Sequence, residues 1–106
     1  MEARGVQVAV ASDEAGTITL VVSGDLDIAT APELARSTSL AIDSGATKIV
    51  IDCGDLQFID SSGINVLLMA WNEMKGRATM PLIVTNLQPN VRKVLDATGV
   101  TGLITE

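Results

Sequence analysis

The first part of the chain shows an apolar pattern with a period of two. One such segment places three residues on the same side of a predicted strand, Val6, Val8 and Val10, and a second covers residues 17–22. This period is typical of β-strands. Residues 13–16 between the two segments have turn composition and include a glycine. The pattern therefore predicts a β-hairpin with one face toward solvent.

The pattern changes after Gly24 to one with the spacing of a helix. The sequence Thr30-Ala31-Pro32-Glu33 has the spacing of a capping box, in which the threonine and glutamate side chains bind free amides of the first turn. A proline is tolerated in that turn because its missing N–H has no helical partner. Apolar residues then recur every three or four positions as far as Ile42. A helix is predicted from this box to Gly45, which can end it in a left-handed conformation.

The rest of the chain alternates between short apolar runs and amphipathic segments. Strands are predicted at residues 48–52, 80–84 and around 103–104, the first of them covered on both faces. Helices are predicted at residues 61–75 and from near residue 89 to Gly99. The order β-β-α-β-α-β-α-β requires crossovers between parallel strands. Residues 1–106 are therefore predicted to form one α/β domain, a five-stranded mixed sheet with an antiparallel first strand and three main helices.

Composition excludes several kinds of chemistry. The chain has no histidine and a single cysteine, Cys53, so it lacks an imidazole base, a histidine metal ligand and an intrachain disulfide. The net charge of −6 argues against nucleic acid and anionic lipid as partners. Its longest apolar run, residues 66–71, is far too short for a membrane span. We expect a cytoplasmic domain whose Cys53, Phe58 and Trp71 lie in the core.

Small polar residues interrupt the apolar pattern at Asp60-Ser61-Ser62-Gly63, where a strand-to-helix loop is predicted. Free amides and the helix dipole favour negative charge there, so a phosphate on Ser61 would be stabilised. Aspartate and serine are also ordinary helix caps, and the four residues alone leave both interpretations open.

Two further carboxylates, Asp25 and Asp27, follow the second predicted strand. The ends of parallel strands meet at one sheet edge, so both are expected near Asp60. Three carboxylates beside a serine can orient its hydroxyl, hold Mg²⁺ or repel a phosphate. The alternative is that Asp25 and Asp27 belong to a surface turn without a function.

Three segments together resemble the STAS domain family, and specifically its stand-alone bacterial anti-sigma factor antagonists: Gly24-Asp25-Leu26-Asp27, Phe58-Ile59-Asp60-Ser61-Ser62-Gly63-Ile64, and residues 89–100. The resemblance covers nearly the whole chain. It implies a non-enzymatic, partner-switching phosphoprotein of transcription regulation and stress response. The unphosphorylated form binds an anti-sigma factor that is also a serine kinase and so frees a sigma factor, whereas the phosphorylated form releases its partner.

The resemblance also assigns roles to single residues. Ser61 matches the phosphate acceptor, Ser62 and Gly63 complete its motif, and three acidic residues surround it: Asp25, Asp27 and Asp60. Asn65 stands where close relatives often carry glycine, which affects partner choice. The chain itself needs no cofactor or metal, and a metal-dependent serine phosphatase is implied for reactivation.

Alternatives come from other classes of protein. The same fold serves as a regulatory or assembly subunit of membrane transport systems, and a serine-dependent enzyme would need a base that the sequence does not show.

Many relatives continue into another helix after the last strand, whereas this sequence stops at Glu106. The surface against which that helix would pack is expected to be either exposed or paired with a second copy in a homodimer. Residues 66, 69 and 74 are candidates for an exposed apolar patch on the second helix, and Arg92-Lys93 is interpreted as a solvated pair.

Overall fold

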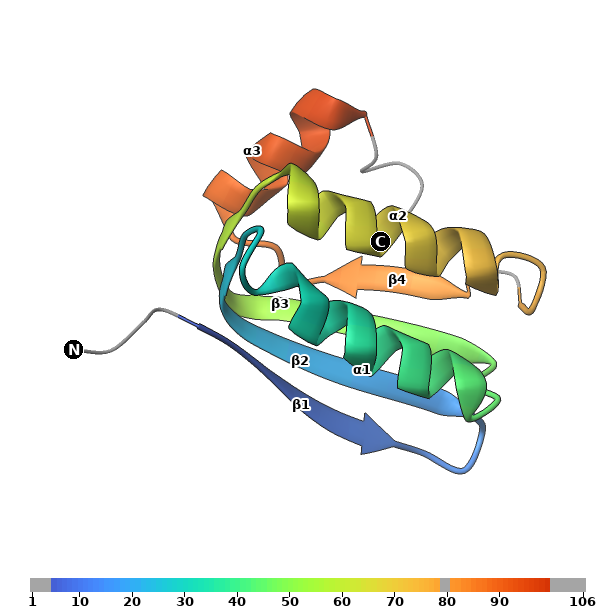
Figure 1. The fold of residues 1–106 in the computed structure, drawn as a ribbon. Helices are drawn as coiled ribbons and strands as arrows, with labels where there is room; N and C mark the ends of the chain where they lie inside the picture. Colours follow the sequence, from blue (N-terminus) through green and yellow to red (C-terminus); the bar gives the residue numbers. More distant parts are fainter. Residues whose placement is uncertain (1–4, 79–80, 100–106) are drawn as a thin grey trace.

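The computed structural model describes residues 5–78 and 81–99. Its elements are β1 (Val6–Ser12), β2 (Thr17–Leu26), α1 (Ala31–Asp43), β3 (Lys48–Ile59), α2 (Ser61–Met74), β4 (Leu82–Thr85) and α3 (Pro89–Thr98). The four described strands form one sheet in the order β1-β2-β3-β4 (Figure 1). The β1–β2 pair is antiparallel and the other two pairs are parallel, as predicted. The predicted fifth strand, around residues 103–104, lies outside the described residues, so the sheet described here has four strands.

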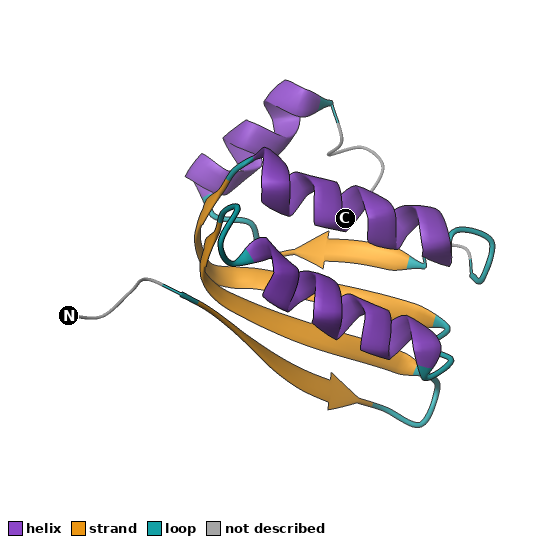
Figure 2. Ribbon diagram, viewed as in Figure 1, coloured by secondary structure: helices purple, strands orange, loops and turns teal. Residues whose placement is uncertain are grey.

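Helices α1 and α2 cover the same face of the sheet (Figure 2). Both crossovers lead in the same direction along the sheet, and right-handed connections then place their helices on one side. Burial along β3 follows this arrangement, because Ile49 and Ile51 are buried whereas Val50 is only half-buried. The prediction that this strand is covered on both faces therefore holds fully for the face of Ile49 and Ile51 and only in part for the face of Val50.

Helix α1 begins at Ala31, as predicted, but the predicted capping box does not form. The Thr30 side chain makes no cap hydrogen bond; its hydroxyl donates to the Asp25 carbonyl oxygen at 2.6 Å. The Glu33 carboxylate lies 3.7 Å from the Arg36 guanidinium. The threonine therefore holds the loop before the helix to the end of β2 instead of binding an amide of the first helical turn.

Strand β3 is much longer than the segment predicted at residues 48–52. Only Ile49–Asp52 pairs with β4, and the strand then continues beside β2 as far as the Leu26–Ile59 pair. Two side-chain amides at the start of α3 donate hydrogen bonds to carbonyl groups of β3. Gln88 binds the Gly54 carbonyl at 2.6 Å and Asn90 binds the Gln57 carbonyl at 2.7 Å. This extension carries the chain to the corner where α2 begins.

The core was predicted in part. Cys53 is buried in the main apolar cluster and Trp71 packs against it, as expected. Phe58 is 44% exposed, so its predicted place in the core is wrong. The neighbouring Ile59 fills the inward position at the end of β3 instead. Met74 is buried, which removes it from the predicted surface patch.

Candidate functional site

The ends of β2 and β3 meet the start of α2 at one corner of the molecule. Asp25 pairs with Phe58 and Leu26 with Ile59, and the Asp60 N–H donates to the Leu26 carbonyl at 3.1 Å. The structure thus brings the Gly24-Asp25-Leu26-Asp27 and Asp60-Ser61-Ser62-Gly63 motifs together, as the sheet-edge argument predicts. We call this region the Ser61 corner.

Asp60 is the N-cap of α2. Its carboxylate accepts a hydrogen bond from the Ser62 N–H at 2.8 Å, which satisfies one of the free donors of the first turn. Ser61 is the first helical residue and is exposed, whereas Ser62 is half-buried. Of the two neighbouring hydroxyl groups, the one on Ser61 is therefore the more accessible to another protein.

Gly63 allows α2 to begin in close contact with the sheet. A Cβ atom at this position would lie 2.8 Å from Ile59 Cγ1 and 2.9 Å from Leu26 Cβ, which is shorter than normal van der Waals contact. The third residue of the helix must therefore be glycine unless these neighbours move. This packing fixes the position of the exposed Ser61 two residues earlier.

Asp27 shapes the loop between β2 and α1. One of its carboxylate oxygens accepts hydrogen bonds from the Ala29 and Thr30 N–H groups, both at 3.0 Å. Asp25 is only 7% exposed, so the interpretation of this pair as two surface aspartates is wrong for Asp25. The three predicted carboxylates share the Ser61 corner, and those of Asp27 and Asp60 accept hydrogen bonds from backbone amides there.

Two large apolar side chains at this corner reach solvent. Ile28, in the loop after β2, is 80% exposed, and Phe58, near the end of β3, is 44% exposed. Exposed apolar side chains beside polar groups are typical of protein-binding surfaces. Ile28 was not among the predicted site residues, although a large apolar residue in a turn between Asp27 and Thr30 is a recognisable signal.

The exposed face of α2 continues from Ser61. Asn65 follows four residues later and Met69 eight residues later, so the three side chains lie along one side of the helix. All three are exposed, and Val66 is half-buried beside them. The predicted apolar patch on this helix therefore reduces to Met69, with a smaller contribution from Val66.

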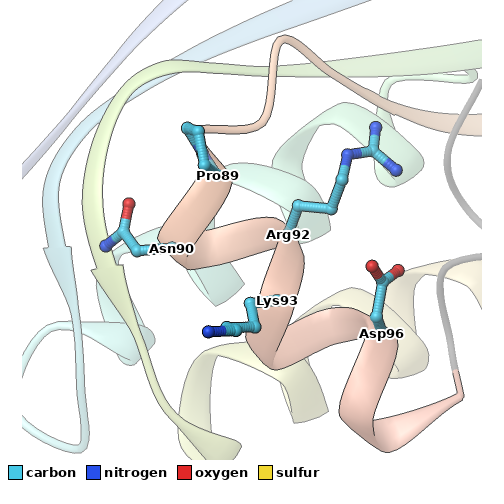
Figure 3. Close-up of a pocket in the computed structure, with 5 residues that line it drawn as sticks. All are labelled: Pro89, Asn90, Arg92, Lys93 and Asp96. Carbon is cyan, nitrogen blue, oxygen red and sulfur yellow. The ribbon is translucent and has the colours of Figure 1, made fainter.

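A separate cavity of ≈ 390 Å³ lies along α3. Its lining residues are Pro89, Asn90, Arg92, Lys93 and Asp96 (Figure 3). Arg92 and Lys93 are exposed, as predicted, and extend to different sides of the helix. This arrangement does not form a joint clamp for a phosphate, and the cavity shares no lining residue with the Ser61 corner.

The described part of the chain contains no group of three or more acidic, histidine or cysteine side chains that could hold a metal ion. Magnesium binding by Asp25, Asp27 and Asp60 together therefore has no geometric support among these residues. Within the same ranges, 5–78 and 81–99, no helix has the length and apolar character needed to cross a membrane.

Comparison with known proteins connects this geometry to a family. Residues 3–105 match the STAS domain family. The putative anti-sigma factor antagonist BtrV of Bordetella bronchiseptica is 27% identical over 84 residues, which are 79% of this chain and 72% of the relative.

Solved structures give the same fold. An anti-sigma factor antagonist from Mycobacterium paratuberculosis superposes with a TM-score of 0.84 at 22% identity, covering 93% of this chain and 82% of the other. SpoIIAA in its unphosphorylated form gives 0.77 at 26% identity, with coverages of 94% and 88%. The phosphorylated form of Bacillus SpoIIAA gives 0.69 at 25%, with coverages of 94% and 91%.

Proposed function

The chain belongs to the STAS domain family, and on this premise we propose that it is an anti-sigma factor antagonist controlled by phosphorylation of Ser61. Its unphosphorylated form binds an anti-sigma factor that is also a serine kinase, and a sigma factor is thereby released. Phosphorylation ends this binding, and a serine phosphatase restores it. In this role the protein is a binding partner and a kinase substrate, and it catalyses no reaction itself.

The observation that carries the proposal is the exposed position of Ser61 at the first residue of α2. A kinase must reach the hydroxyl group that it modifies, and the neighbouring Ser62 is half-buried whereas Ser61 is exposed. The relatives support the same interpretation, because BtrV is named a putative anti-sigma factor antagonist and SpoIIAA has been solved in unphosphorylated and phosphorylated forms.

A phosphate on Ser61 would disturb the fold little. It adds about −1.5 to −2 charges, and its favourable interaction with the start of an exposed helix is worth about 0.3 to 1 kcal/mol. The Asp60 carboxylate beside it opposes part of this gain. Because Ser61 is exposed, the phosphate keeps its water and requires no rearrangement of the core.

The same phosphate would strongly affect a bound partner. Ile28 and Phe58 expose apolar surface next in sequence to Asp27 and Ile59, and we expect a partner that binds at the Ser61 corner to contact this surface as well as Ser61. The phosphate would then lose water inside the interface, where an uncompensated charge costs several kcal/mol. Binding can thus be switched by a local change of charge.

The proposal is tested by incubating the purified chain with candidate anti-sigma factor kinases and ATP, followed by peptide mapping. We expect a single phosphate on Ser61, which Ser61→Ala abolishes and the matched control Ser62→Ala retains. A phosphate on Ser62 or on a threonine such as Thr30 would contradict the assignment. Absence of both phosphorylation and binding would favour the alternative of a subunit that regulates or assembles a transport system.

A further inference from the structure

Strand β1 forms one edge of the sheet. It pairs with β2 through a continuous antiparallel register from the Val6–Gly24 pair to the Ser12–Ile18 pair. Within the described ranges no strand lies on its other side (Figure 1). Its outer edge therefore presents backbone donors and acceptors that none of the four described strands satisfies.

The flanking hydrogen bonds identify the groups that point outward. The Asp13 N–H donates to the Thr17 carbonyl at 3.0 Å, and the Asp25 N–H donates to the Gly5 carbonyl at 3.4 Å. Bonded and non-bonded positions alternate in an antiparallel pair, so the odd-numbered residues of β1 face β2. The outward N–H and C=O groups belong to the even-numbered residues, which are Val6, Val8, Val10 and Ser12.

This edge lacks the usual protection against pairing with another strand. Natural edge strands carry charged residues, prolines or bulges, whereas Val6–Ser12 contains no charge and no proline and pairs without a register shift. Val10, whose backbone groups face outward, also has a side chain that is 63% exposed. The sequence and the geometry thus leave the strand open for another β-strand.

We propose that β1 pairs antiparallel with β1 of a second copy of this chain, centred on Ala9, which joins the two sheets into one. In this register Val8 faces the partner subunit's Val10, and Ala9 faces the partner subunit's Ala9. All hydrogen-bonded pairs then fall on even-numbered residues, which are the ones whose backbone groups point outward. The register therefore uses the whole length of the strand and is symmetric, as a two-fold dimer requires.

Charge favours the antiparallel direction. The acidic turn at Asp13 and Glu14 follows β1 directly, in a chain of net charge −6. A parallel arrangement would place the two acidic turns side by side. The antiparallel arrangement separates them by about eight residues, or about 27 Å, which exceeds the Debye length of about 10 Å. None of these residues belongs to the Ser61 corner, so the inference does not depend on the proposed function.

Two cysteine variants test the pairing and its register. Ala9 and Ala11 are both exposed and lie on the same face of β1. In the proposed dimer, thiols introduced by Ala9→Cys face each other across a pair whose Cα atoms are about 4.5 Å apart, a separation that a disulfide can bridge. Thiols introduced by Ala11→Cys are about 14 Å apart. The native Cys53 is buried and does not compete.

We expect the Ala9→Cys variant to form a covalent dimer at least roughly tenfold faster than the Ala11→Cys variant under the same mild oxidant, since only its thiols are held together. The unmodified chain should sediment as a dimer at about 100 µM. Val10→Lys should be monomeric because it places two positive charges near the centre of the pairing. The matched control Leu40→Lys, at a residue of nearly the same exposure (64% against 63%) on α1, should remain dimeric.

Circular dichroism establishes that each variant is folded. Equal rates of cross-linking for the two cysteine variants, or faster cross-linking of Ala11→Cys, would overturn the register. A monomeric unmodified chain at this concentration would overturn the pairing itself.

Discussion

Gly63 lies where α2 begins against the ends of β2 and β3, and its missing side chain sets how closely the helix approaches the sheet. An alanine usually stabilises a helix relative to glycine by about 1 kcal/mol. Here the added Cβ would press on the Ile59 side chain and on the Leu26 Cβ. Overpacking of this kind costs about 1–3 kcal/mol, so steric conflict should outweigh the gain in helix propensity.

We therefore predict that Gly63→Ala lowers the free energy of unfolding by up to about 2 kcal/mol, measured by urea denaturation. The control Asn72→Ala, at an exposed position of the same helix, should change it by no more than about 0.5 kcal/mol. A Gly63→Ala variant at least as stable as the unmodified chain would show that the contact is not tight.

Cys53 gives a prediction about pH. Burial, with a smaller contribution from the Asp52 carboxylate, raises the pKa of its thiol from 9.0 to about 12. The unfolded chain therefore loses this proton at a lower pH than the folded protein. Its contribution to stability is fully present below pH 9.0 and is lost as the pH rises toward about 12.

The free energy of unfolding should accordingly fall above pH 9.0, and Cys53→Ala should show a weaker decrease in the same urea titrations. At pH 8 the native thiol should react with an alkylating reagent only as fast as the protein opens. Rapid alkylation of the native protein would show that the thiol is accessible.

Single residues also show where sequence patterns are insufficient. Ser61, Ser62 and Asp60 could be placed at a helix start because their types and their position before an apolar stripe are both local signals. Phe58 and Ile59 are both apolar, and the sequence does not say which of them faces the core. Irregularities in the pairing of β2 with β3 shift the inward side by a residue, and only the structure determines that shift.

At the scale of elements, the start of α3 supports the outer half of β3, which leads to the Ser61 corner. Beyond Asp52, no described strand pairs with β3 on the β4 side, and the Gln88 and Asn90 side chains donate hydrogen bonds to β3 carbonyl groups there. The three helix starts were predictable from spacing and prolines, and the left-handed Gly45 and Gly99 were predictable stops. The outer half of β3 was not predictable as a strand, because its glycine and aspartate residues disfavour strands. The side chains that bind it, Gln88 and Asn90, also lie more than thirty residues away in the sequence.

Replacing both amides tests this link. The double variant Gln88→Ala/Asn90→Ala should lose about 1–3 kcal/mol of stability, since each lost hydrogen bond contributes about 0.5–1.5 kcal/mol. Amide hydrogen exchange should accelerate in α3 and in the outer half of β3, while the β1–β2 pair keeps its protection. Arg92→Ala, at an exposed position on α3, is the control. Unchanged exchange in the double variant would contradict the assigned role of the two amides.

At the scale of the whole molecule, the proposed switch adds a phosphate to one corner of the domain and leaves the rest of the fold unchanged. The core and the sheet lie behind α1 and α2, whereas Ser61 and the apolar side chains of Ile28 and Phe58 lie at an exposed corner. Modification of that corner can alter recognition without altering the packing beneath it. The central claim is therefore that phosphorylation changes the affinity for a partner far more than it changes the structure.

Calorimetric binding to an anti-sigma factor kinase that phosphorylates the chain tests this claim most directly, using unmodified protein, phospho-Ser61 protein, Ser61→Ala and Ser61→Asp. We predict that phosphorylation weakens binding by about 1.4 to 4 kcal/mol, or roughly tenfold to a thousandfold. Ser61→Asp should reproduce part of this loss and Ser61→Ala none of it. Backbone amide resonances of the sheet should stay nearly unchanged. Equal affinities of the phosphorylated and unmodified forms, or a general shift of the sheet resonances on phosphorylation, would contradict a switch based on local charge.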